Sequence, residues 1–373
     1  MDFRLTEEQL MVQQLTKDFR EKELEPIAAE IDRTGRFPHD LRKKMAELGL
    51  VEMTVPVEYG GPGMDCLTAC LVFEELGYTL PALILELETA GARLTRFGNE
   101  EQKKKYLPTL CKGETIGSWS FTESATGSDP RLIKTTAIPN GDYYVINGEK
   151  RFCSNGNKPG PIMLFAKDEN GKITLFVFDK FLPGYSHSKP YELMGLRGME
   201  DVDVYYDNVR IHKSCLVGEK GNAFKMLTTG EPNTRIYQSA VCVGLGRRCI
   251  DEAIKYAKER PNRKEGNIAN LLNIQYLLAE MEARNAACKA LAYQLAAKFD
   301  SGAEVTVDAA TARLFVTTAT VEISEMAMQV FGAYATTKDF VIERLYRDAK
   351  MFKLWGGSQE ILRTIVANNL INK

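Results

Sequence analysis

Two short stretches of the sequence concentrate residue types that contact ligands more readily than they fill a core. Trp119 to Asp129 reads W-S-F-T-E-S-A-T-G-S-D, and its small hydroxyls and glycine let main-chain amides approach a bound group closely. Such strings also form ordinary surface turns. The second stretch, Trp355 to Ser358, places two glycines and a hydroxyl directly after an aromatic ring. Metal chemistry is not indicated, because the three histidines stand far apart and no cysteines have C-x-x-C spacing.

The pattern along the chain predicts three regions that would hold these stretches. Residues 6–112 read as helices, which open with a capping box between Thr6 and Gln9 and are interrupted by a Gly/Pro cluster at 56–62. Alternating, β-rich runs separated by Asn-Gly turns occupy residues 116–220 and predict hairpins. Amphipathic helical patterns return from residue 222. We therefore expect domains at 1–115, 116–221 and 222–373.

The composition is that of a globular protein without an evident nucleic-acid or membrane role. The 373 residues are 44% hydrophobic and 26% charged, and the net charge of −2 gives no attraction to anionic polymers or lipid surfaces. No apolar run reaches the roughly 18 residues of a membrane span. The N-terminal residues show no leader, and eight scattered cysteines are expected to stay reduced, so we expect a cytoplasmic protein.

The last 27 residues carry the strongest resemblance to a known family. Arg347 to Lys373 (R-D-A-K-M-F-K-L-W-G-G-S-Q-E-I-L-R-T-I-V-A-N-N-L-I-N-K) resembles the C-terminal signature of the flavin-dependent acyl-CoA dehydrogenases, and the resemblance extends over nearly the whole chain. It implies an α+β multi-domain fold with an N-terminal helical domain, a middle β-barrel or sandwich and a C-terminal four-helix bundle. It also implies FAD, an acyl-CoA thioester, an electron-transfer flavoprotein partner and a homotetramer.

Two segments of the middle region match the family's flavin motifs. Trp119 to Asp129 is similar to a T-E-P-x-A-G-S-D loop, and Asn147 to Asn155 is similar to N-G-x-K-x-(W/F)-I-(T/S)-N. The resemblance implies that an aromatic side chain packs on the flavin and that hydroxyl groups form hydrogen bonds with the flavin ring. One serine faces the CoA arm, so we expect it to contact both the cofactor and the substrate. The residues in these roles are Phe121, Thr122, Phe152, Ser154 and, toward CoA, Ser128.

Further cofactor contacts are implied in the C-terminal region. Gln329 to Ala333 is similar to Q-(I/V)-(L/F)-G-G, which places Gln329 and Gly332 against the adenosine half of a neighbouring subunit's FAD. Ser358 and Glu360 match residues that reach the flavin. The family's R-x-x-F-G motif is altered at residues 259–266, where either Arg260 or Arg263 would meet the FAD pyrophosphate, or the segment is a solvated basic loop.

The family's catalytic base is missing. Many members carry a glutamate where this chain has Gly356, which retains only its N–H to polarise the thioester carbonyl. Some relatives move the glutamate to the position before an arginine, but here that pair is Thr234-Arg235, with Arg235 still expected at the substrate. Glu231, one turn earlier, is the alternate acid or base, or else a carboxylate that favours a helix N-terminus.

Three functions tolerate this loss. The Gly-Gly-Ser motif is similar to that of crotonobetainyl-CoA reductase, which indicates an enoyl-CoA reductase. It is also similar to that of 3-sulfinopropionyl-CoA desulfinase, which indicates β-elimination from an acyl-CoA. The third is a non-catalytic flavin- or CoA-binding subunit. Glu86 and Glu88 are the acidic residues that we expect near the acyl cavity, where one of them would favour a cationic acyl group or both would be ordinary surface carboxylates.

Overall fold

The N-terminal third of the chain is helical, as expected. The computed structural model describes residues 4–229, 232–264 and 266–372. The predicted capping box is confirmed, because Thr6 Oγ1 accepts from Gln9 N and the Gln9 side chain accepts from Thr6 N. The helices of this region are α1 (Glu7–Phe19), η1 (Arg20–Leu24), α2 (Ala28–Thr34), α3 (His39–Glu47), η2 (Val57–Tyr59), α4 (Cys66–Thr79), η3 (Pro81–Leu83), α5 (Ile84–Leu87), α6 (Gly91–Phe97) and α7 (Glu100–Cys111).

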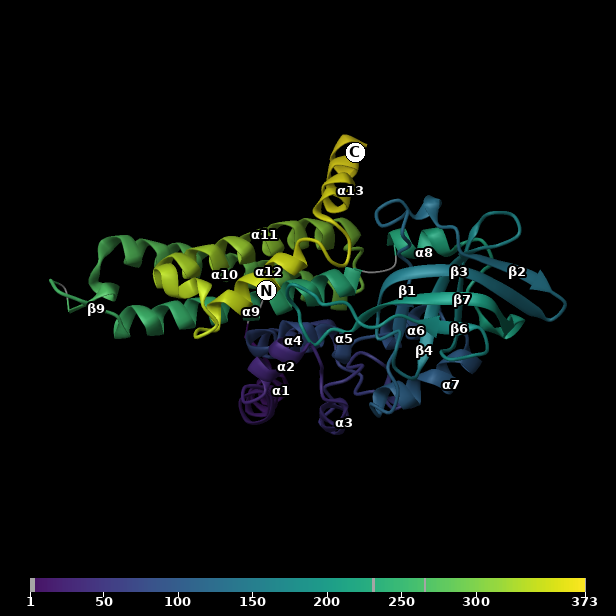
Figure 1. The fold of residues 1–373 in the computed structure, drawn as a ribbon, viewed down its shortest axis with the longest axis horizontal. Helices are drawn as coiled ribbons and strands as arrows, with labels where there is room; N and C mark the ends of the chain where they lie inside the picture. The colour runs from purple at the N-terminus through teal and green to yellow at the C-terminus, as the bar shows by residue number, and fades with distance from the viewer. Residues whose placement is uncertain (1–3, 230–231, 265, 373) are drawn as a thin grey trace.

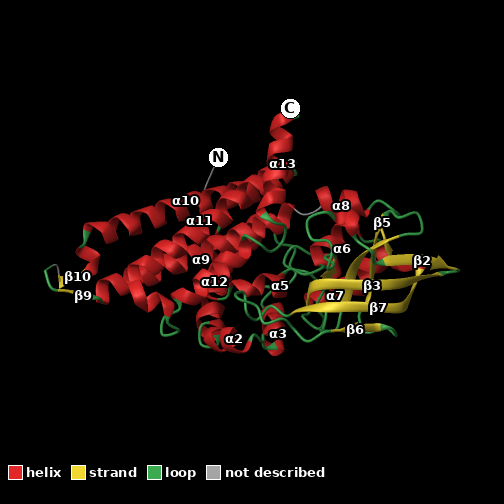
Figure 2. Ribbon diagram, turned by 45° about the horizontal axis from the view of Figure 1, so that its top comes forward, coloured by secondary structure: helices red, strands yellow, loops and turns green. Residues whose placement is uncertain are grey.

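The middle region is a mixed, eight-stranded sheet with the order β6-β7-β3-β2-β4-β5-β8, and β1 pairs with β4. Figure 2 shows β6, β7, β3 and β2 in this sheet. The strands are β1 (Ser118–Ser120), β2 (Thr136–Asn140), β3 (Tyr143–Ser154), β4 (Pro161–Lys167), β5 (Ile173–Asp179), β6 (Tyr185–His187), β7 (Asp201–His212) and β8 (Leu216–Val217), with the short helices η4 (Pro130–Leu132) and η5 (Lys213–Cys215).

The expected β domain is confirmed, but no closed barrel forms among the described residues, since β6 and β8 at the ends of the order do not pair. Helices α6 and α7 pack on one side of the sheet, where Leu94 and Leu107 join Phe165 and Val177 in a buried cluster. Because helices cover this apolar face, the sheet buries it without curling closed.

The C-terminal region is a bundle of long helices that packs on the N-terminal region (Figure 1). Its elements are α8 (Ala223–Thr229), α9 (Pro232–Glu259), β9 (Pro261–Asn262), β10 (Gly266–Asn267), η6 (Ile268–Asn270), α10 (Leu272–Asp300), α11 (Thr306–Phe331), η7 (Gly332–Thr336), α12 (Ile342–Phe352) and α13 (Gln359–Ile371). Helix α4 approaches α9 so closely that a Cβ on Gly244 would overlap the main-chain oxygen of Glu74. Small residues at this crossing therefore couple the two helical regions.

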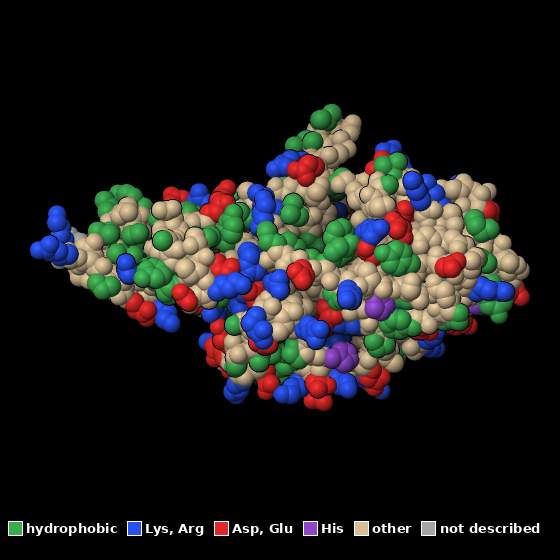
Figure 3. All heavy atoms as spheres, in the orientation of Figure 1, with side chains coloured by type: hydrophobic (Ala, Val, Ile, Leu, Met, Phe, Trp, Pro, Cys, Tyr) green, Lys and Arg blue, Asp and Glu red, His purple; other side chains and the backbone are tan. Residues whose placement is uncertain are grey.

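Figure 3 shows basic, acidic and apolar side chains intermingled on this face, with a basic tip at the end where Figure 1 labels β9. Within the described ranges, we find no helix whose length and apolar character would suit it to crossing a lipid bilayer.

Candidate active site and cofactor-binding surface

An exposed aromatic ring stands on a bulge of β3. The pairing of β3 with β7 shifts register between Lys150 and Cys153, and Phe152 within this bulge has φ +52°. Its side chain is 55% exposed, and its ring stacks on Tyr191 with centroids 4.8 Å apart. Non-glycine residues adopt this backbone region at a cost, and such strain concentrates at functional sites. The bulge thus presents a flat apolar face to a ligand.

The loop after β1 is fastened beside this bulge. Arg151 N donates to Thr122 O at 2.7 Å, and the buried Glu123 carboxylate accepts from Lys150 Nζ at 2.9 Å. Burial lowers the pKa of Lys150 to about 8. Phe121 packs edge-on against Phe165 and is half-buried. The structure therefore brings Phe121, Thr122 and Phe152 to one edge of the sheet.

The predicted hydroxyl contacts differ in their surroundings. Ser154 Oγ donates to Asp201 Oδ1 at 2.5 Å, and burial raises the pKa of Asp201 to about 6. A ligand at this position would therefore meet a hydroxyl whose proton is already engaged. Ser128 is exposed, in the loop between β1 and η4. Its contact with a CoA arm stays a prediction.

A buried arginine fixes the loop around Gly356. Arg313 on α11 is 1% exposed and donates to the carbonyl oxygens of Gly356 at 2.9 Å and Gly357 at 2.7 Å. It also donates to Phe352 and Trp355 oxygens. Burial and the nearby charge of Arg235 lower the pKa of Arg313 to about 10. The Gly356 N–H has no backbone acceptor among the described residues, so it remains available to a thioester oxygen.

The space that a side chain at residue 356 would use is taken by Gln238. Gly356 has φ +71°, and a Cβ built there would fall inside contact distance of Gln238 Nε2 and 3.2 Å from its Cδ. Gln238 on α9 is fully buried, and neither of its amide atoms has a hydrogen-bond partner among the described residues. A buried amide without partners costs about 1–3 kcal/mol, so this side chain is not explained by packing.

Arg93 joins the three regions of the chain. Its guanidinium lies over the Trp119 ring at 4.3 Å and donates to Thr89 O at 2.6 Å. The helix α9 position before Arg235 is Thr234, whose hydroxyl lies 3.5 Å from the same guanidinium. Arg235 itself is half-buried and donates to Thr306 O at 3.5 Å. The site is thus rich in arginine.

The two acidic candidates of the N-terminal region behave differently from each other. Glu86 is buried and accepts from Lys158 Nζ at 3.1 Å, with Arg42 3.9 Å away, so its charge is neutralised. Glu88 accepts from Thr54 N at 3.1 Å, and its second oxygen is buried without a partner. Burial and the charge of Glu52 raise the pKa of Glu88 to about 8. Contact of either with a cationic acyl group stays a prediction.

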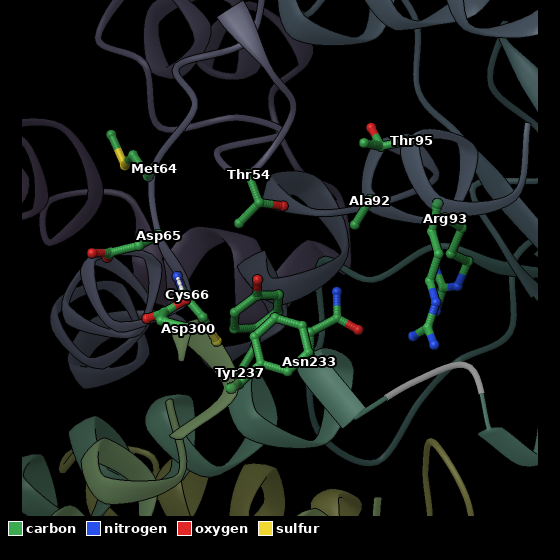
Figure 4. A pocket seen from close by; sticks show the side chains of 12 residues that line it. Thr54, Met64, Asp65, Cys66, Ala92, Arg93, Thr95, Asn233, Tyr237 and Asp300 are labelled. Atoms are coloured by element: carbon green, nitrogen blue, oxygen red, sulfur yellow. Dashed lines mark hydrogen bonds between the residues drawn. The ribbon is translucent and has the colours of Figure 1, made fainter. Parts of the chain in front are cut away.

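A pocket of about 280 Å³ opens between the N-terminal helices and α9. Figure 4 shows Tyr237 and Asn233 on α9 opposite Thr54 and Ala92, with Arg93 at one side. Tyr237 precedes Gln238 but turns toward α4, where its ring stacks on Phe73 at 4.7 Å. The pocket and the Gly356 loop thus both meet α9, through its neighbouring residues Tyr237 and Gln238.

The remaining predicted residues lie on the outer surface. Gln329 and Gly332 share a shallow hollow of about 480 Å³, which suits the expected contact with a neighbouring subunit's cofactor. Arg260 lies over the Tyr334 ring at 5.4 Å, while Arg263 is exposed on the β9–β10 hairpin, so the choice between them stays open. Ser358 precedes α13, and the exposed Glu360 pairs with Arg363. Glu231 lies outside the described residues.

Sequence comparison identifies the chain. Three family models match: the N-terminal domain of acyl-CoA dehydrogenase over residues 6–114, its middle domain over 118–209 and its C-terminal domain over 224–371. The chain belongs to the acyl-CoA dehydrogenase family. It is similar to a 3-(aryl)acrylate reductase of Clostridium sporogenes, with 37% identity over 98% of this chain and 99% of that protein.

Other members extend the similarity to reductases and dehydrogenases. An acryloyl-CoA reductase (NADH) of Anaerotignum propionicum is 35% identical over 100% of this chain and 97% of its own. The caffeyl-CoA reductase–Etf complex subunit CarC of Acetobacterium woodii is 32% identical over 99% of each chain. The structure of butyryl-CoA dehydrogenase from Megasphaera elsdenii matches with a TM-score of 0.95 and 29% identity over 100% of both chains. The chain is thus an acyl-CoA oxidoreductase.

Members of the family bind FAD, and one matching structure, an acyl-CoA dehydrogenase of Bacillus anthracis, is described as complexed with FAD (TM-score 0.94, 28% identity, 99% of this chain and 68% of that one). The residues here fit a flavin, because the exposed Phe152 ring and the Phe121–Thr122 loop meet at one sheet edge. Phe152, Thr122 and Ser154 would hold the ring.

Sequence reasoning overlooked three polar residues. Gln238 lies 118 positions before Gly356 and Arg313 lies 43 positions before it, each on another helix. Arg93 lies on α6, which carries none of the family motifs named above. The only signal available was an arginine or glutamine on an otherwise apolar helical face.

Proposed function

We propose that this protein reduces α,β-unsaturated acyl-CoA thioesters. The observation that carries the proposal is the environment of Gly356, where a neutral amide and two arginines stand in place of a carboxylate base. Dehydrogenation requires a base for the α-proton, whereas reduction requires only a proton donor.

The proposed reaction assigns separate tasks to the groups around the thioester. FAD, when bound and reduced, supplies a hydride to the β-carbon. The Gly356 N–H donates to the thioester oxygen, and the positive charge of Arg313 and Arg235 stabilises the negative charge that develops there. We further propose an electron-transfer flavoprotein as the electron donor, since a relative is named as part of such a complex.

The acyl group would occupy the pocket between Thr54 and Tyr237, whose volume of about 280 Å³ suits a compact chain or a single aromatic ring. Relatives named for acryloyl and arylacrylate reduction support this size range. We also propose a cytoplasmic location, from the N-terminal residues and the scattered cysteines, and a homotetramer, from the family resemblance.

The test is a pair of anaerobic half-reactions on the purified flavoprotein. Acryloyl-CoA and cinnamoyl-CoA are expected to reoxidise the dithionite-reduced flavin, while propionyl-CoA and 3-phenylpropionyl-CoA leave the oxidised flavin coloured over the same time. Bleaching by a saturated thioester at the rate of reoxidation would refute the proposal. A colourless protein that takes up no FAD would indicate the non-catalytic subunit instead.

β-Elimination is the second candidate. Arg93 and Arg96 line the pocket and favour an anionic acyl terminus, although Asp65 and Asp300 line it as well. Release of sulfite together with propionyl-CoA from 3-sulfinopropionyl-CoA and water, without any electron acceptor, would establish the desulfinase-like reaction. No release, together with reduction of cinnamoyl-CoA, would dismiss it.

A further inference from the structure

Gln238 is a fully buried polar side chain beside the Gly356 loop, and no hydrogen bond within the described residues compensates for its burial. Its exposed fraction is 0%, and both Nε2 and Oε1 lack hydrogen-bond partners among the described residues. Arg313 Nε also lacks a partner, but its other two nitrogens donate to carbonyl oxygens, and some buried amides nearby are satisfied. Gln359, for example, donates to the hydroxyls of Thr317 at 3.2 Å and Thr318 at 2.9 Å. Gln238 thus keeps one donor group and one acceptor for something outside the chain.

The direction of the amide indicates what it meets. A side chain built on Gly356 would run into the Gln238 amide, so this amide lies where a base at residue 356 would begin. The Gly356 oxygen is already taken by Arg313 at 2.9 Å, which leaves the Gly356 N–H and the Gln238 amide as the polar groups facing this space. Both suit a small polar molecule or a thioester oxygen.

We propose that Gln238 is a positioning residue that holds the water molecule which protonates the substrate α-carbon. This inference rests on the proposed reduction. When hydride adds to the β-carbon, the electron pair of the C=C bond moves onto the α-carbon and the thioester oxygen. A water O–H bond then breaks, its proton forms the new α-C–H bond, and the hydroxide left behind takes a proton from solvent.

An amide suits this task better than a carboxylate in this direction. Gln238 Oε1 accepts from the water and Nε2 donates to its oxygen, so the water is oriented without a negative charge beside the developing anion. Arg313 and Arg235 supply positive charge nearby, and both the anion and the transient hydroxide gain from it. A glutamate here would instead compete for the proton that the water delivers.

The experiment compares Gln238→Leu with wild type in D2O, using cinnamoyl-CoA and reduced methyl viologen. Deuterium enters both carbons of the product, and NMR coupling constants distinguish the two diastereomers. Wild type is expected to give one diastereomer. Q238L is expected to give a mixture, a kcat at least tenfold lower, a larger solvent isotope effect and little change in KM.

Stability supplies a second, activity-independent reading. Q238L removes unpartnered buried groups and is expected to melt at a higher temperature than wild type in the cofactor-free form. Ser324→Ala is the matched control, because Ser324 is also buried but donates to Val321 O at 2.7 Å, so its loss is expected to lower the melting temperature. A structural role for Gln238 would instead lower the melting temperature of Q238L.

The outcomes separate the two proposals. A flavin-loaded wild type that reduces none of the enoyl-CoA probes would refute the proposed function, and the role of Gln238 would fall with it. An active wild type matched by Q238L in rate and in product diastereomer would overturn the role of Gln238 alone.

Discussion

Restoring a glutamate at residue 356 tests the reasoning about this site most directly. By family resemblance alone, Gly356→Glu should create dehydrogenase activity. The structure changes that expectation, since φ at Gly356 is +71° and a Cβ there would overlap the Gln238 amide. We therefore predict that Gly356→Glu alone gains little, and that Gly356→Glu combined with Gln238→Ala gains dehydrogenase activity.

The magnitude follows from two opposing effects. A positioned general base contributes roughly 10²–10⁴ in rate. A side chain in the left-handed backbone region costs about 1–2 kcal/mol, and about 1.4 kcal/mol corresponds to a factor of ten. If the whole strain energy is lost from the stabilisation of the transition state, the rate gain of the double variant falls by about tenfold and remains about 10- to 1,000-fold. In the single variant, the carboxylate and the amide compete for one space, so the gain stays below about tenfold.

The assay is stopped-flow bleaching of the oxidised flavin by 3-phenylpropionyl-CoA without oxygen. Gln238→Ala alone is the control, because it opens the space without supplying a base and is expected to show no gain. Equal gains in the single and double variants would show that Gln238 does not occupy the base position. No gain in either would show that the α-C–H bond does not face residue 356.

Three further perturbations test the surroundings. In the folded protein the pKa of Glu88 is about 8, above its unfolded value of about 4.3, so the free energy of unfolding should fall as pH rises from about 5 to 8. Glu88→Gln should flatten this pH dependence when denaturant titrations at the two pH values are compared. An unchanged pH dependence would contradict the raised pKa of Glu88. Arg313→Lys removes a planar guanidinium that donates to four carbonyl oxygens, so it should lower the free energy of unfolding by about 1–3 kcal/mol. The loosened loop should also be cleaved faster by protease after Lys353. Cleavage at the wild-type rate would contradict this role of Arg313. Phe152→Ala should weaken FAD binding about two- to tenfold, since aromatic stacking contributes about 0.5–1.5 kcal/mol. Phe181→Ala, also exposed and at positive φ, is the matched control, and equal losses in an FAD titration would defeat the stacking argument.

Local patterns predicted the elements well, because their causes are local. The capping box at Thr6 and the Asn-Gly turns depend on a few neighbouring residues and appear as expected. Closure of the sheet depends on which strands meet at its ends. Alternation along each strand carries no such information, so the open order was not predictable.

Only part of the candidate site could be predicted from the sequence, because the rest depends on how distant helices pack. Phe152 and Gly356 lie inside recognisable motifs, whereas Gln238 becomes significant only when α9 packs beside the α12–α13 loop. Glu86 and Glu88 stand two residues apart, and a continuous helix would have turned them to different faces. Helix α5 ends at Leu87 and Glu88 is extended, so helical facing did not govern where the two carboxylates point.

The guanidinium of Arg93 has a consequence for how this protein can be recombined. It lies over Trp119 from the sheet, hydrogen-bonds Thr89 in its own region and lies near Thr234 on α9. The three family segments therefore meet at one side chain and do not behave as interchangeable modules. A chimera that imports a relative's middle segment without an aromatic at position 119 would leave a partly buried cation without its ring. Exchanges between relatives should succeed only when positions 93, 119 and 234 travel together.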